Sequence, residues 1–289
     1  MNVSVDADSV RPVRYDLALF RQLNKEYASK PLVPRPLSNK PVDLMKRGKK
    51  RAAAIASKYD LKGKRVLEIG CGRGATCKAL AENHRCDVVG VDIVRYDDWA
   101  NAPSGATLLQ LDLTESRPDL GSFDFIYSNA VFEHVRHPYS MLKAAHDLLN
   151  PGGEMYIAAN LYRGPKASHR YRHVYFPWPH LLFTDEVFEE FFISIGREPM
   201  RASWVNQLSI ADYYRYFDIV GFERLETSFN TTPIDEAFYR RFVDKLERIP
   251  RYDLERDFLK VRLQKPATKA PQPKRLSTWQ RIKEVFTSR

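Results

Sequence analysis

The chain has 289 residues, 44% of them hydrophobic and 12% aromatic, so it is long enough to bury a full core of ordinary globular composition. No stretch approaches the roughly 18 uninterrupted apolar residues of a membrane span, and residues 1–10 lack the apolar segment of a secretory signal. Three cysteines, Cys71, Cys77 and Cys86, fit neither a disulfide framework nor a zinc pattern. These features predict a soluble, cytoplasmic protein with free thiols.

The net charge of +10 belongs to the two ends of the chain. Residues 1–60 carry 13 Lys+Arg against 6 Asp+Glu, and residues 265–289 carry 7 against 1. Residues 61–264 carry 26 against 29, so the central part of the chain is mildly acidic. Basic ends indicate a nucleic-acid substrate more weakly than a basic catalytic face would. Nucleic acid is therefore not the expected partner.

The N-terminal part predicts two helices joined by a stiff connector. Residues 17–28 and 42–59 have helical character, and the second has an alanine-rich face. Three prolines within residues 30–36 fix φ and remove backbone donors, so that segment is expected to be extended. We divide the chain into an N-terminal extension (1–41), a central domain (42–264) and a basic tail (265–289).

From residue 64 onward, short apolar strands alternate with helices. The predicted strands are 64–69, 87–91, 107–111, 123–128, 154–159, 221–229 and 257–263, with helices at 75–83 and 139–149. This alternation is typical of βαβ units, whose parallel sheet is covered on both faces. We predict a Rossmann-like α/β fold with a mostly parallel sheet of seven strands and helices on both faces. The second helix is expected to be broken by the sequence Asn-Pro-Gly-Gly at 150–153.

An aromatic-rich insert, residues 161–204, follows the fifth strand. It mixes Tyr, Trp, Arg and His side chains, which stack on sugars, hydrogen-bond to them, or bind anionic groups. A helix is expected from Asp185. His169 and His173 would share a helix face, but no carboxylate or cysteine completes a metal pattern, so we predict no metal site.

The strand at 64–69 runs directly into three glycines, Gly70, Gly72 and Gly74, and then into a helix. Glycines let the backbone turn sharply and let a ligand lie against main-chain atoms. The loop therefore predicts a cofactor site. It also satisfies a loose dinucleotide pattern, because Asp92 lies about 20 residues further on, where that pattern has its ribose-binding acid.

The charge of Glu68 bears on which cofactor binds. A dinucleotide would bring its pyrophosphate near this turn, and two like charges about 4 Å apart cost about 4 kcal/mol at an effective dielectric of about 20. S-adenosylmethionine has no phosphate and carries a sulfonium and an ammonium, for which a carboxylate is favourable. This argument disfavours a dinucleotide without excluding it, and Glu68 could instead cap a neighbouring element.

Taken in order, these segments resemble class I S-adenosylmethionine-dependent methyltransferases. Residues 66–80 look like the first motif, and residues 89–92 are similar to the end of the second strand. Residues 110–113 resemble the end of the third strand, residues 123–135 the fourth strand with its loop, and residues 149–153 the approach to strand five. The resemblance covers residues 42–160 strongly and 204–264 loosely.

The resemblance implies an enzyme that binds S-adenosylmethionine. Asp92 would hold the ribose hydroxyls and Asp112 would meet the adenine amino group, although either acid could cap a turn instead. Ser128 or Asn129 would offer backbone carbonyls to the ammonium. The expected cofactor-binding residues are Glu68, Gly70, Cys71, Gly72, Gly74, Asp92, Ile93, Asp112, Leu113, Ser128 and Asn129.

Methyl transfer from a sulfonium requires a positioned acceptor and excluded water. A hydroxyl acceptor also benefits from a base, and His134 is the first candidate, ahead of Glu133 and His137. His134 could instead pack on the cofactor or orient its loop. Residues 176–184 resemble the acceptor-side segment of methyltransferases associated with bacterial surface polysaccharides. The expected acceptor is therefore a hydroxyl of a sugar, a glycan or another small molecule.

Two other functions stay open. One is an RNA or protein methyltransferase whose basic ends supply phosphate affinity. The other is a non-catalytic protein of the same fold that binds a partner. In the tail, Leu276, Trp279, Ile282 and Phe286 fall on one stripe, which predicts an amphipathic helix for peripheral contact with an anionic membrane or for docking on protein. No pattern predicts an oligomeric state.

Overall fold

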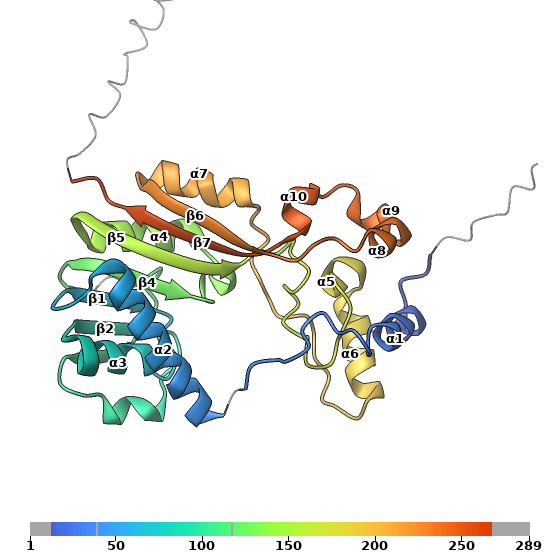
Figure 1. The fold of residues 1–289 in the computed structure, drawn as a ribbon, viewed down its shortest axis with the longest axis horizontal. Helices are drawn as coiled ribbons and strands as arrows, with labels where there is room; N and C mark the ends of the chain where they lie inside the picture. The colour runs from blue at the N-terminus through green and yellow to red at the C-terminus, as the bar shows by residue number, and fades with distance from the viewer. Residues whose placement is uncertain (1–12, 39, 117, 268–289) are drawn as a thin grey trace, which may run out of the picture.

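A sheet of seven strands organises the molecule and confirms the predicted α/β class (Figure 1). The computed structural model describes residues 13–38, 40–116 and 118–267. Across the sheet the strands are β3 (Ala106–Gln110), β2 (Asp87–Asp92), β1 (Arg65–Ile69), β4 (Phe123–Asn129), β5 (Leu149–Asn160), β7 (Arg256–Gln264) and β6 (Glu223–Thr231). Strands β1 to β5 pair in parallel, and β7 is antiparallel to both β5 and β6. The chain changes direction across the sheet between β1 and β4, which opens a ligand crevice at their carboxyl ends.

Helices cover both faces of this sheet, as predicted. One face is covered by α2 (Pro41–Tyr59) and α3 (Ala75–His84), and the other by α4 (Pro138–Leu148) and α7 (Ile210–Val220). Two further helices, α1 (Leu17–Glu26) and α6 (Asp185–Ser194), lie beside the sheet. Successive strand residues point to opposite faces, so Val66 joins the core beneath α2 and α3, whereas Leu67 joins the core beneath α4 and α7. Both cores hold fully buried apolar side chains, which is the burial that a parallel sheet requires.

A third apolar cluster joins the N-terminal extension to the insert. Phe20 of α1 lies between aromatic rings of the insert, with its centroid 4.6 Å from that of Phe191 and 5.1 Å from that of Phe176. The short helices α5 (Pro179–Leu182), α8 (Glu236–Arg241), α9 (Val243–Leu246) and α10 (Arg251–Leu254) add to it. Figure 1 shows α1, α5, α6, α8 and α9 grouped beside one end of the sheet. The extension and the insert therefore share a core, while the division into domains at residues 41 and 264 stays a prediction.

Three stretches differ from the sequence prediction. Strand β5 begins at Leu149, before the Pro-Gly-Gly sequence, because Leu149 already pairs with Phe123 of β4. The next pair is Phe125 with Glu154, so the Pro-Gly-Gly residues lie in a shift of the register between these two pairs. Helix α7 was not predicted, although Ser209 and Asp212 form a capping box at its start. The helices α8 to α10 are short and were also missed, since four to six residues show little periodicity.

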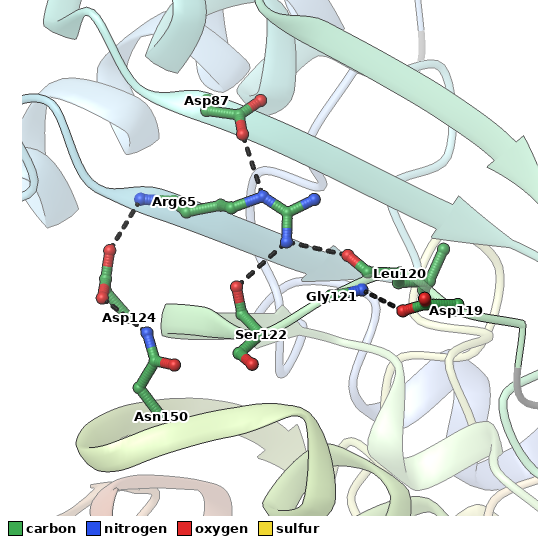
Figure 2. A network of polar contacts seen from close by, with 8 residues as sticks. All are labelled: Arg65, Asp87, Asp119, Leu120, Gly121, Ser122, Asp124 and Asn150. Atoms are coloured by element: carbon green, nitrogen blue, oxygen red, sulfur yellow. Dashed lines mark hydrogen bonds and ion pairs between the residues drawn. The ribbon is translucent and has the colours of Figure 1, made fainter.

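Arg65 ties together the amino ends of β1, β2 and β4, at the edge opposite the crevice (Figure 2). Its Nε donates to Oδ2 of Asp87 at 2.9 Å, and its Nη1 donates to the carbonyls of Leu120 at 2.7 Å and Ser122 at 3.0 Å. Its backbone N–H donates to Oδ2 of Asp124 at 3.0 Å. One side chain thus satisfies acceptors on two other segments and positions the start of the central strand.

We expect Arg65→Ala to lower the free energy of unfolding by about 1–3 kcal/mol, because two carbonyls and one carboxylate lose their donor. Urea denaturation of the two proteins measures this difference. The control is Lys143→Ala, which removes only an exposed ion pair with Asp147 and should cost less than about 0.5 kcal/mol. Equal losses in the two variants would show that the network adds nothing beyond an ordinary surface contact.

No helix within the described part of the chain is long and apolar enough to cross a membrane. The amphipathic helix predicted within the basic tail lies outside the described residues.

Candidate active site

The glycine loop between β1 and α3 adopts left-handed backbone at all three glycines. The angle φ is +76° at Gly70, +52° at Gly72 and +75° at Gly74. A Cβ at Gly70 would lie 2.2 Å from Cγ2 of Val131, and a Cβ at Gly74 would lie 2.5 Å from Cδ1 of Leu108. A Cβ at Gly72 would meet nothing within 4 Å. Packing therefore requires glycine at 70 and 74, whereas only backbone conformation favours it at 72.

Asp92, the last residue of β2, holds the loop in place. Its Oδ2 accepts a hydrogen bond from the backbone N–H of Gly72 at 2.8 Å, and its Oδ1 accepts one from Val94 at 3.0 Å. The acid therefore caps the turn after β2, which was the alternative to ribose binding, and it also lines the cavity described next. The two roles are compatible, because a carboxylate has about four lone-pair sites.

Two cavities meet at Gly70, at the carboxyl ends of β1 and β2. The larger has a volume of about 460 Å³, and its walls include the predicted residues Gly70, Asp92, Ile93, Asp112, Leu113 and His134. The smaller has a volume of about 300 Å³, and its walls include Glu68, Gly70, Cys71 and Gly72. Gly74, Ser128 and Asn129 line neither cavity. The side chain of Ser128 is fully buried, and its hydroxyl donates to the carbonyl of Ile69 at 3.2 Å.

The larger cavity combines carboxylates with apolar walls. Oδ1 of Asp112 accepts from the backbone N–H of Thr114 at 2.8 Å and from its hydroxyl at 2.7 Å, so this acid also caps its turn. Leu113 and Met141 supply apolar surface. A flat base with an amino group and a ribose with two hydroxyls match this combination, because the carboxylates accept their hydrogen bonds.

Glu68 is buried beneath the glycine loop, with only 4% of its surface exposed. Cys77 donates its thiol proton to Oε2 at 3.0 Å. Burial raises the pKa of Glu68 to about 7, opposed by the hydrogen bond from Cys77 and by the charge of Arg51. Near neutral pH this carboxyl is therefore partly protonated, and a cationic ligand beside it would favour the ionised form.

We expect the affinity for S-adenosylmethionine to rise with pH, because the cationic ligand and the proton on Glu68 oppose each other. With a pKa of about 7, the Kd at about pH 6 should be about eightfold higher than at about pH 7.5. Calorimetric titration at the two pH values measures the ratio. In Glu68→Gln the ratio should fall to about 1. A pH-independent Kd in the unmodified protein would rule out a charged contact with Glu68.

Arg47 and Arg51 of α2 line the smaller cavity and were not predicted as site residues. Helix α2 packs closely on α3, where a Cβ at Gly48 would lie 2.5 Å from that of Ala75. Nη1 of Arg47 donates to the carbonyl of Ser38 at 2.6 Å. The guanidinium groups suit a carboxylate such as that of a methionine moiety. Their i, i+4 spacing was visible in the sequence, but which face of the helix meets the loop was not.

His134 ends the short helix η2 (Phe132–His134) and lines the larger cavity. Its Nδ1 lies 2.6 Å from the carbonyl oxygen of Trp204. Since a carbonyl only accepts, Nδ1 carries the proton and Nε2 keeps a free lone pair. Of the other two candidates for a base, His137 lines the same cavity, whereas Glu133 is fully buried and does not.

The insert brings His169, and not His173, next to His134. Residues 161–178 form turns and no helix, so the prediction that the two histidines share a helix face was wrong. The ring centroids of His169 and His134 are 5.2 Å apart, whereas His173 packs on Phe192 at 5.7 Å. Burial raises the pKa of Glu133 to about 7 and lowers that of His169 to about 4.

A third cavity, with a volume of about 580 Å³, lies between the proline-rich connector and the carboxyl end of β5. We call it the strap cavity, and 'the larger cavity' continues to mean the larger of the two that meet at Gly70. Its polar lining includes Arg35, Asn160, Lys166, Tyr171 and Asn230. The N–H of Leu32 donates to the carbonyl of Tyr175 at 2.8 Å, so the connector is fastened to the insert. Tyr171 lies two residues from His169, which places the strap cavity beside the segment that reaches His134.

Comparisons with known proteins agree with this geometry. Residues 43–226 match a family described as a methyltransferase domain. A ubiquinone biosynthesis O-methyltransferase of Pseudomonas aeruginosa is 33% identical over 128 residues, which cover 39% of this chain and 51% of that protein. A tRNA U34 carboxymethyltransferase of Pseudomonas fluorescens is 32% identical over 123 residues, which cover 39% of this chain and 37% of that protein. The chain thus spans about half or less of the curated relatives it matches.

Solved structures share the fold. An S-adenosylmethionine-dependent methyltransferase from Mesorhizobium loti superposes with a TM-score of 0.50 at 19% identity, covering 76% of this chain and 99% of that one. A phosphoethanolamine N-methyltransferase of Haemonchus contortus in complex with S-adenosylmethionine gives a TM-score of 0.50 at 16% identity, covering 75% and 52%. At such identities the likeness concerns the fold alone.

Proposed function

The chain belongs to the methyltransferase-domain family that matches residues 43–226, and on this basis we propose that it transfers a methyl group from S-adenosylmethionine to a hydroxyl oxygen. The observation that carries the proposal is the meeting of two cavities at Gly70. Asp92 and Asp112 on one side suit adenosine, while Glu68 and two arginines on the other suit a cationic amino acid with a carboxylate. Relatives named O-methyltransferases favour oxygen as the acceptor atom.

The residues at the larger cavity suit an in-line displacement. The donor supplies an activated methyl group, so the protein has to align the acceptor oxygen behind the methyl carbon and exclude water. The O–C bond forms as the C–S bond breaks. Nε2 of His134 takes the hydroxyl proton, and the carbonyl of Trp204 keeps the imidazole in the tautomer that can do so. The products are a methyl ether and S-adenosylhomocysteine.

For the acceptor we propose a sugar or glycan hydroxyl. The strap cavity supports this choice, because the side chains of Asn160, Tyr171 and Asn230 provide both donors and acceptors beside apolar residues of the connector. Arg35 at the same cavity suits an acidic substituent, such as the phosphate of an activated sugar. A hydroxylated aromatic small molecule would instead pack against the apolar residues of the connector.

The cofactor is tested first, by calorimetric titration with S-adenosylmethionine and with NAD. NAD is included because arginines at the smaller cavity would also suit a phosphate. We expect S-adenosylmethionine alone to bind, and Asp92→Ala to weaken it at least tenfold, or about 1.4 kcal/mol. Asp97→Ala, an exposed acid on the neighbouring η1 (Asp97–Asn101), is the control and should bind normally. Binding of NAD alone would refute the proposal.

The acceptor is then identified by turnover. Radiolabelled methyl donor is incubated with nucleotide sugars, glycans and hydroxylated aromatics, and the product is located by mass spectrometry. Methyl transfer to RNA or protein, with a rate that falls steeply with salt, would favour the alternative substrate class instead.

A further inference from the structure

Two adjacent side chains and a third from a distant segment meet beside the larger cavity. Glu133 and His134 come from η2, and His169 comes from the insert. One potential ligand atom from each lies within 4.8 Å of the other two. The cluster stands at the carboxyl edge of the sheet, where His134 faces the cavity proposed to hold the methyl donor.

Two members of this cluster lack hydrogen-bond partners despite complete burial of their atoms. Neither carboxylate oxygen of Glu133 has a partner within hydrogen-bond geometry among the described residues, although the backbone N–H groups of Glu133 and Asn160 lie near enough to lower its pKa, and the residue is 0% exposed. Nε2 of His169 is likewise buried without a partner in the described chain. Buried charges in proteins are normally paired or coordinate metals, so a carboxylate with no cationic partner among the described residues, beside an imidazole nitrogen with no hydrogen-bond partner there, indicates a site for a cation.

The backbone conformation of His169 and a hydrogen bond of His134 also favour metal binding. His169 has φ of +54°, a left-handed conformation that costs energy for a residue with a Cβ and that occurs often at functional sites. The Nδ1 proton of His134 is held by the carbonyl of Trp204. Metal-bound histidines typically donate their second N–H to such a carbonyl, which orients the ring and directs the other lone pair at the ion.

We propose that Glu133, His134 and His169 bind one divalent cation, with the open coordination positions toward the larger cavity. Two imidazoles and one carboxylate suit Zn²⁺ or Mn²⁺ rather than Mg²⁺ or Ca²⁺, which prefer oxygen ligands. The role of the ion rests on the proposed function. An acceptor hydroxyl bound to the ion would lose its proton to solvent more readily. In that case His134 would be a ligand, and this route would replace the one in which Nε2 of His134 takes the proton.

Metal binding is measured on the full-length protein after chelator treatment, with no donor or acceptor present. MnCl₂ is titrated and free Mn²⁺ is followed by electron paramagnetic resonance, and ZnCl₂ is then added as a competitor. We expect one Mn²⁺ per chain, displaced by Zn²⁺ because Zn²⁺ binds such ligands more tightly. His169→Asn, which tolerates the left-handed backbone, and Glu133→Gln should each weaken Mn²⁺ at least tenfold.

His173→Asn is the matched control, since it removes a histidine of the same insert that lies outside the cluster and should leave the Kd for Mn²⁺ unchanged. Thermal melts of all variants verify folding. Failure of the unmodified protein to bind either ion would overturn the proposal and leave Glu133 to be satisfied by buried water. Equal weakening by His169→Asn and His173→Asn would overturn it too. If the ion binds as expected but the protein transfers no methyl group, the metal site stands and only the proposed function is refuted.

Discussion

The Gly70→Ala variant is expected to lose detectable binding of S-adenosylmethionine, a reduction of at least about 100-fold, or about 2.7 kcal/mol. Gly70 lies where the two cavities meet, so any shift of its backbone disturbs both halves of the cofactor site. A methyl group there would collide with Val131 at 2.2 Å, and φ of +76° adds about 1–2 kcal/mol of strain for alanine. The free energy of unfolding should fall as well. Calorimetry and urea denaturation measure the two effects.

Two further variants separate collision from strain. Gly63→Ala introduces the same methyl group in open space at φ of +73°, away from both cavities, so it should show strain alone and leave the affinity unchanged. Val131→Ala combined with Gly70→Ala removes the atoms that collide, and it should recover part of the stability but not all of it. Identical losses of stability at positions 70 and 63 would mean that the contact with Val131 has no influence.

The His134→Gln variant is expected to lower kcat by about 10²–10⁴, with the Kd for S-adenosylmethionine nearly unchanged. Glutamine keeps a polar side chain of similar length, but its amide is not basic enough to take the proton of the acceptor, and it offers an ion only a neutral oxygen in place of an imidazole nitrogen. The measurement is steady-state methyl transfer with an acceptor found in the screen, together with calorimetry of donor binding. Loss of kcat without loss of donor affinity identifies a group that acts on the acceptor.

The control for this prediction is His84→Gln at the end of α3, which lines none of the three cavities described above. It should leave kcat within about twofold of the unmodified enzyme. If His134→Gln kept full kcat, the histidine would orient its loop or pack on the cofactor, and neither base catalysis nor a metal would involve it.

Most of the sheet was predictable because its signals are local. Each of the seven strands was predicted within a few residues of its observed bounds except β5, whose start the Pro-Gly-Gly sequence concealed. The glycine loop, with Glu68 before it, lies within one strand, one turn and the start of one helix. Asp92 ends β2, and Asp112 follows the end of the neighbouring parallel strand β3 by two residues, so the order of the strands alone brings both acids to the same edge of the sheet.

The rest of the site depends on contacts between distant segments. Arg51 lies on a helix whose orientation toward the glycine loop is set by the close packing of Gly48 on Ala75. Trp204 reaches His134 through its backbone carbonyl, which no side-chain pattern reveals. The three segments that form the third cluster lie far apart in the chain, at about residues 15–27, 174–202 and 234–254, and their mutual burial folds the extension onto the insert.

The sequence by itself determined the fold class, the cofactor loop and the two strand-end acids, because hydrophobic periodicity and glycine conformation act within about 10–20 residues. Only the tertiary structure decided that His169 meets Glu133 and His134, that His173 does not, and that the connector forms one wall of the strap cavity. The physical reason is that packing of the third apolar cluster and the turns in residues 161–178 determine which residues become neighbours. These turns have no regular repeat, so the path of their backbone depends on burial against distant segments.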